Sequence, residues 1–145
     1  MHSSFAPILL ALGVSISASC AYDSQAAEAA APPTVDLESA VVVARGSFSG
    51  MNDHVVTGTV QIVELGGQSF LRLQDSFTLD GAPDPKVGFG TSGTYDQAST
   101  VSPLRATTGA QDYVLPASFS LDTLNEAYIW CDQFSVGLGV ARLTR

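Results

Sequence analysis

The sequence contains few of the side chains that bind metals or carry out thiol chemistry. Its 145 residues include two cysteines, Cys20 and Cys131, and two histidines, His2 and His54. Multi-histidine zinc sites and the HExxH motif are therefore excluded, because they need several imidazoles at close spacing. A CxxC pair and a CxxCH motif are also absent, which excludes dithiol exchange within the chain and covalent attachment of a c-type haem.

Basic residues are scarce as well. Six lysines and arginines stand against 14 aspartates and glutamates, giving a formal net charge of -8. From Gly46 onward, ten acids face five scattered bases. Because binding to phosphates needs a basic face, nucleic acid is excluded as a partner.

The amino-terminal apolar run, from Phe5 to Ile16, is too short for a membrane span, which takes roughly 20 apolar residues. It is followed by small residues up to Ala21, a pattern typical of an export signal. We therefore predict a signal peptide over residues 1–21 and a secreted, periplasmic or cell-surface protein. The mature chain would then contain no membrane span.

Two alternatives remain for this segment. A lipoprotein signal would keep Cys20 as the acylated first residue of the mature chain, although Ser17 stands where such signals usually carry leucine. In the second alternative the segment stays uncleaved. This is favoured by the small positive charge before the apolar run, because export signals usually begin with basic residues. Cleavage after Ala21 removes Cys20 and leaves Cys131 as an unpaired thiol.

Residues 22–40 are rich in alanine, include Pro32-Pro33 and carry acids without a base, so we predict a flexible linker. The folded part then spans residues 41–145. About 100 residues are enough for one domain with its own core and too few for two.

The folded part consists almost entirely of strand and turn patterns. Residues rich in β-branched side chains run from Val55 to Leu65, stop at Gly66-Gly67 and resume at Ser69 to Leu73, which predicts a hairpin. Leu71 and Leu73 straddle Arg72 and should face one interior. Further strands are expected at 86–90, 112–116, 127–131 and 134–143. Short strands separated by glycine and proline turns predict an all-β fold, an antiparallel β-sandwich or barrel-like single domain.

The last run alternates bulky and small residues, with Phe134, Val136, Leu138 and Val140 in one set. We expect this bulky face to lie in the core and the small face to pack closely against another backbone or sheet. Truncating Phe134 would then cost on the order of 3–5 kcal/mol.

Five groups of residues carry a resemblance to a known family. They are Asp53-His54 with Thr57-Gly58-Thr59-Val60, Leu71-x-Leu73-x-Asp75-x-Phe77, Gly81 to Pro85 with Val87, Gln111 to Pro116, and Ile129-Trp130-Cys131 with Phe134, Val136, Gly139 and Ala141. In this order they resemble the DM-thirteen domain, a small electron-transfer domain also found in Skeletor-like proteins and beside DOMON domains.

The resemblance implies an extracellular or periplasmic all-β module that exchanges electrons with a protein donor or acceptor. It assigns the central role to Cys131, either as a naked thiol or as the ligand of a group such as haem or another thiolate-ligated group. His54 and Trp130 are the candidates for further contacts with such a group. The sequence names no cofactor and no metal.

Each of these residues also has a structural interpretation. Free cysteine is often buried as a small hydrophobic residue, a lone histidine beside a strand commonly forms surface hydrogen bonds, and tryptophan is usually a packing anchor. The alternative function is therefore a non-catalytic cell-surface binding or adhesion module in which Cys131 is structural. No motif marks an enzyme, so enzymatic turnover stays open and ranks third.

Overall fold

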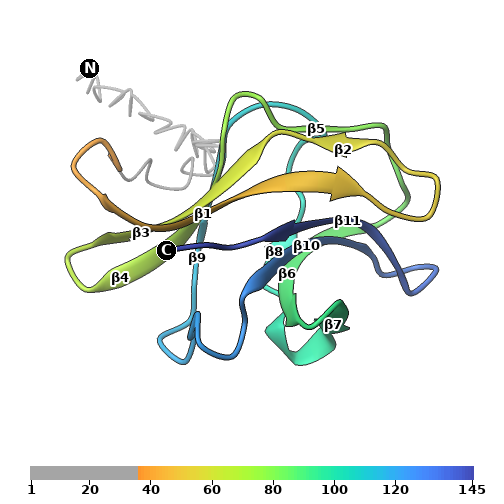
Figure 1. Ribbon diagram of the computed structural model, residues 1–145. Helices are drawn as coiled ribbons and strands as arrows, with labels where there is room; N and C mark the ends of the chain where they lie inside the picture. Colours follow the sequence, from red (N-terminus) through yellow and green to blue (C-terminus); the bar gives the residue numbers. More distant parts are fainter. Residues whose placement is uncertain (1–35) are drawn as a thin grey trace, which may run out of the picture. The chain divides into compact units, whose positions relative to one another are not determined.

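The computed structural model describes residues 36–145, which form an all-β domain without an α-helix in that range (Figure 1). The predicted signal peptide and residues 22–35 of the predicted linker lie outside the described residues. None of the described residues forms a helix long and apolar enough to cross a membrane.

Nine of the strands make one antiparallel sheet that curls into a half-barrel, in the order β7-β6-β10-β11-β1-β3-β4-β9 with β8 paired to β6. Its strands are β1 (Val41–Gly50), β3 (Thr59–Leu65), β4 (Gln68–Leu73), β6 (Pro85–Thr91), β7 (Thr94–Asp96), β8 (Ser102–Pro103), β9 (Gln111–Val114), β10 (Glu126–Cys131) and β11 (Val136–Arg142). A small second sheet pairs β2 (Val56–Thr57) with β5 (Thr78–Leu79), and a single 3-10 turn, η1, covers Gln97–Ser99. The all-β, barrel-like prediction is confirmed.

The predicted hairpin is present as β3 and β4. Leu65 pairs with Gln68 across the turn, and the two turn glycines, Gly66 and Gly67, have φ of 57° and 79°. A two-residue turn with positive φ at both positions matches the twist of the flanking strands, and glycine adopts it without steric cost.

The prediction of one strand from Val55 to Leu65 is wrong in one respect. Gly58, with φ of 98°, interrupts the run, so β2 leaves the main sheet and pairs with β5. Only the part after Gly58 continues as β3 beside β1. The break follows from tertiary packing, since a Cβ at Gly58 would lie 2.5 Å from the Cα of Phe77.

The main core lies inside the curled sheet. Leu71 and Leu73 are fully buried there, as predicted, and Phe77 and Leu138 join them. Side chains on the other face of β3 and β4 form a second, smaller cluster in which Phe70 and Val63 pack with Leu37. Leu37 is 2% exposed although it falls within the range predicted as linker.

The prediction for Phe134 is wrong. Phe134 lies in the turn between β10 and β11, its side chain is 63% exposed, and β11 begins only at Val136. Ser135 has φ of 53°, which ends the extended backbone just before the strand.

The bulky residues of β11 also do not share one face. Ile129 pairs with Gly139 but Trp130 pairs with Gly137, so Leu138 is an extra residue at a β-bulge. The bulge shifts the alternation, and Leu138 and Ala141 both face the main core while Val140 is half-buried. The close packing expected at the small residues is found at Gly139, where a Cβ would lie 2.7 Å from the Cβ of Val56.

Candidate functional site

Cys131 is the last residue of β10 and lies at the edge of the main core. It pairs with Pro85 of β6 on one side and Val136 of β11 on the other. Its side chain is 1% exposed, and its thiol donates to the carbonyl oxygen of Pro83 at 3.1 Å. The next residue, Asp132, is already exposed. Cys131 is therefore buried at the edge of the core, in contact with the segment that leads into β6 and next to an exposed position.

We call residues 80–84 the covering segment, because Pro83 of this segment lies on the Cys131 sulphur. Its first residue, Asp80, accepts hydrogen bonds from the Val55 amide at 3.0 Å and pairs with the His54 Nδ1 at 3.0 Å. The Val55 amide, followed by the His54 imidazole, lowers the pKa of the Asp80 carboxyl. At its other end, the carbonyl of Asp84 accepts from the Asp132 amide at 3.2 Å. The segment is thus held to the loops on both sides.

His54 and Cys131 both contact the covering segment, but through different residues. The His54 Nδ1 is hydrogen-bonded to the Asp80 carboxylate, and the Cys131 thiol donates to the Pro83 carbonyl. The fold therefore brings His54 to the end of the sheet where Cys131 lies, without a hydrogen bond between the two side chains. Within residues 36–145, no group of three or more His, Cys, Asp or Glu side chains is arranged to hold a metal ion.

Trp130 lies on the other face of the sheet from Cys131, as expected for neighbouring residues of a strand. Its indole stacks on Tyr95 with ring centroids 4.3 Å apart and an interplanar angle of 11°. Tyr95 in turn makes an edge-to-face contact of 5.6 Å with Tyr128. The indole Nε1 is buried and has no hydrogen-bond partner within the described part of the chain. Trp130 is therefore an anchor of an aromatic row outside the core, and it does not share a site with Cys131.

One residue of this row, Tyr95, had no signal in the sequence, whereas Tyr128 lies two positions before Trp130 in β10 and so shares its face. Burial raises the pKa of both the Tyr95 and the Tyr128 phenol. The Tyr128 hydroxyl donates to Glu126 at 3.3 Å, and Glu126, only 4% exposed, also accepts from the Gly93 amide at 2.8 Å. Tyr95 is 35 positions before Trp130, so no local pattern connects them.

Gly88, Gly90 and Gly93 have the spacing of a dinucleotide-binding GxGxxG motif, but their setting is different. Gly88 and Gly90 belong to β6, and Gly93 lies in the turn before β7, where no helix begins. A Cβ at Gly88 would lie 2.6 Å from the Tyr95 hydroxyl. The two strand glycines, Gly88 and Gly90, make room for the rings of Tyr95 and Tyr128.

A haem at Cys131 does not fit the arrangement of the described residues. An axial thiolate must face a cavity wide enough for the macrocycle. The Cys131 sulphur faces the Pro83 carbonyl and the packed side chains of the main core instead. His54 is engaged by Asp80, and Trp130 lies on the opposite face, so the three predicted contacts do not converge on one group.

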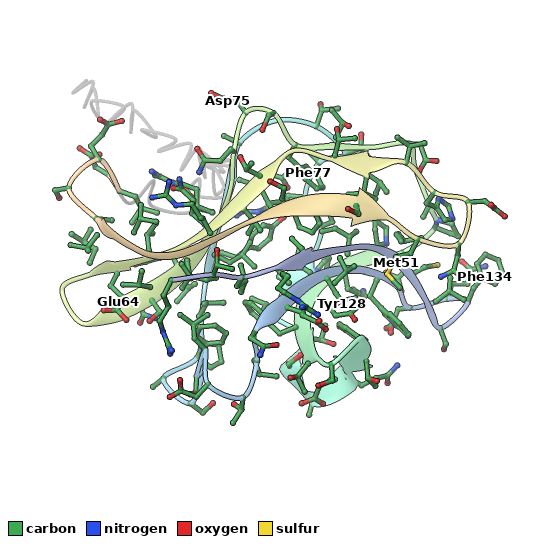
Figure 2. All side chains as sticks on the ribbon, viewed as in Figure 1. Met51, Glu64, Asp75, Phe77, Tyr128 and Phe134 are labelled. Atoms are coloured by element: carbon green, nitrogen blue, oxygen red, sulfur yellow. The ribbon has the colours of Figure 1, made fainter. Side chains whose placement is uncertain are left out.

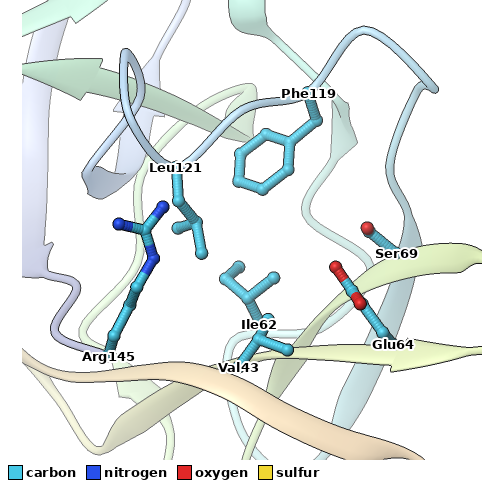
Figure 3. Close-up of a pocket in the computed structure, with 7 residues that line it drawn as sticks. All are labelled: Val43, Ile62, Glu64, Ser69, Phe119, Leu121 and Arg145. Carbon is cyan, nitrogen blue, oxygen red and sulfur yellow. The ribbon is translucent and has the colours of Figure 1, made fainter.

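A cavity of about 440 Å³ is lined by residues of β1, β3 and β4 and of the chain after β9 (Figure 3). Its apolar wall consists of Val43, Ile62, Phe119 and Leu121, with Glu64 and Ser69 on one side and Arg145 on the other. Cys131 is at the β11 start of the β10–β11 pair, whereas the cavity is lined from the start of β1 and the end of β3. The cavity and the thiol are therefore separate features.

Comparison with known protein families gives a match over most of the domain. A family model described as electron transfer DM13 matches residues 47–143, which is most of the described domain and includes Cys131. No curated protein matches the chain, and no solved structure matches it. The match covers more than half of the sequence and confirms the resemblance seen in the residues. The chain therefore belongs to the electron transfer DM13 family.

Proposed function

We propose that this chain is an exported electron-transfer module whose redox group is the Cys131 thiol. The observation that carries the proposal is the position of Cys131 in an electron-transfer family domain, at the end of β10 and directly before the exposed Asp132. A single carbonyl, that of Pro83, accepts from the thiol. The proposal requires that the covering segment move away from the sulphur while the sheet stays intact.

The electron balance defines what such a thiol needs. Residues 36–145 contain no second cysteine, so oxidation to a disulfide takes its other sulphur from a partner protein or a small thiol. When the S–S bond forms, the two thiols together release two protons to solvent and two electrons, which an oxidised redox protein must accept. Because the thiolate is the attacking form, reaction requires that the sulphur first be exposed to solvent.

A second function is favoured by the burial of the same residue. Cys131 is 1% exposed within an apolar cluster, which is ordinary for a structural cysteine. The domain would then be a non-catalytic binding or adhesion module that engages a cell-surface partner. The two functions differ in whether the thiol takes part in electron exchange.

We expect Cys131→Ser to abolish redox activity and to leave the fold intact. The serine hydroxyl is smaller but still donates to Pro83, so the contact to the covering segment is kept. Protein-film voltammetry on a carbon electrode, in the presence of a small thiol, measures the electron exchange without a known partner.

In the wild-type protein, a bulky maleimide should modify Cys131 much more slowly in the folded state than in urea, since modification requires local opening.

The matched control is Cys131→Ala, which removes both the sulphur and the hydrogen bond. It should lose redox activity equally and lose somewhat more stability than the serine variant. A voltammetric wave of full size in the serine variant would contradict the redox role and support the structural function. The protein isolated from its native compartment can also be examined for a visible absorption band. A band that persists unchanged in the serine variant would likewise contradict the redox role of Cys131.

We also propose that the protein is exported, because the apolar run at residues 5–16 is followed by small residues. Intact-mass analysis of the protein isolated from the producing cells should give a chain that begins near Tyr22, or at a lipidated Cys20. An intact chain that begins at Met1 would contradict export by cleavage.

A further inference from the structure

The loops around Cys131 form one continuous surface, which we call the loop end: residues 51–55, 80–84 and 132–135. Two backbone hydrogen bonds join the loops: the Asp80 amide to the Val55 carbonyl at 3.1 Å, and the Asp132 amide to the Asp84 carbonyl at 3.2 Å. The Met51 amide donates to the Leu138 carbonyl of β11 at 2.8 Å and so fixes residues 51–55 to that strand. The Asn52 side chain donates to the Gly137 carbonyl at 2.8 Å. Figure 2 shows Met51 and Phe134 at the same edge of the domain. The surface is therefore preformed, and binding on it would order few groups.

Large apolar side chains are exposed on this surface. Phe134 is 63% exposed and Val55 is 59% exposed. The other phenylalanines of residues 36–145 are buried or half-buried. An aromatic side chain that projects from a fixed loop is the kind of residue that contributes most to a protein interface.

The loop end is also acidic. It carries Asp53, Asp80, Asp84 and Asp132, while Lys86, paired with Asp84 at 2.6 Å, supplies the one adjacent base. With His54 counted as neutral, four carboxylates and one ammonium give a formal charge of -3. Four of the five arginines in residues 36–145 are engaged elsewhere: Arg72 with Asp112, Arg142 with Glu126, Arg145 with Asp122, and Arg105 over the Tyr113 ring. The fifth, Arg45, lies within β1 and outside the loop end.

We propose that the loop end is the docking surface for a redox protein with a basic face, and that Phe134 lies at the centre of the contact. Acidic side chains around an aromatic residue attract a basic surface and steer its approach. A second copy of this chain fits poorly, because it would bring two faces of the same charge together. A partner docked here would lie against the covering segment, next to Cys131. This inference rests on the proposed electron-transfer function and adds to it the kind of partner protein.

The probe is a soluble c-type cytochrome with a ring of lysines around its exposed haem edge, titrated into the isotope-labelled protein at low salt. We expect fast-exchange chemical-shift changes confined to the loop end, and a dissociation constant that rises on the order of tenfold between about 20 and 200 mM salt. Phe134→Ala should weaken binding about tenfold, and Asp132→Asn about threefold.

Matched controls keep the test specific. Val114 is 59% exposed and lies on β9, so Val114→Ala should leave the affinity unchanged. Asp75 is exposed like Asp132 but lies away from Phe134 in Figure 2, so Asp75→Asn should change it little. Cys131→Ser should bind as the wild type does even though it transfers no electrons, which separates a failure of docking from a failure of the redox role.

Several results would overturn the docking surface. One is a set of shift changes centred outside the loop end, and another is an affinity unaffected by Phe134→Ala. Equal binding of an acidic redox protein, such as a flavodoxin, would contradict the charge argument. Self-association through the loop end would contradict a basic partner and would show that the surface binds a second copy of this chain.

Discussion

Replacing Phe77 with alanine should lower the free energy of unfolding by about 3–5 kcal/mol. Phe77 is fully buried in the main core (Figure 2). It packs edge-to-face against Phe48 with ring centroids 5.6 Å apart. The substitution would remove a whole ring from a closed interior, and the surrounding strands are fixed by hydrogen bonds that limit collapse of the cavity.

Phe134→Ala is the matched control, and urea denaturation of both variants is the measurement. Because the Phe134 ring is 63% exposed, its removal should cost less than about 1 kcal/mol. A large loss at Phe134 together with a small loss at Phe77 would mean that the core is assigned to the wrong phenylalanine.

Replacing Gly58 with alanine should destabilise the domain by more than about 3 kcal/mol. The φ of 98° at Gly58 is one that side-chain-bearing residues rarely adopt. In addition, the new Cβ would lie 2.5 Å from both the Cα of Phe77 and the carbonyl oxygen of Ser76. These are backbone atoms, so relief requires the segment that leads into β5 to move.

Gly109→Ala separates the two causes. Gly109 has a similar φ of 86°, but a Cβ there would meet nothing within 4 Å. Only the conformational strain should remain, about 1–2 kcal/mol. Thermal unfolding of both variants would show the difference, and equal losses would contradict the role given to the contact between Gly58 and Phe77.

Local patterns predicted the parts of the fold that depend on neighbouring residues. The hairpin at Gly66-Gly67 follows from two turn glycines between runs of β-branched residues, and the burial of Leu71 and Leu73 follows from their two-residue spacing. The family was also evident from the order of its motifs, and the match over residues 47–143 confirmed it. The prediction that Cys131 is the functional residue stays a prediction.

Local patterns failed where distant segments set the geometry. The bulge at Leu138 depends on how β11 pairs with β10, and alternation within β11 alone placed Phe134 and Val140 in the core. The contacts of Tyr95 with Trp130 and Tyr128 depend on the pairing of β7 with β6. Sequence spacing carries no information on such contacts.

The sequence by itself determined that this chain is an acidic, all-β domain with one cysteine in its folded part, because composition and strand periodicity are properties of the chain alone. Only the tertiary structure decided what surrounds that cysteine. In the folded domain the covering segment contacts Cys131, His54 is hydrogen-bonded to Asp80, and Trp130 lies on the opposite face of the sheet. The physical reason is that these contacts join segments from separate strands and loops, and only closure of the half-barrel brings them together.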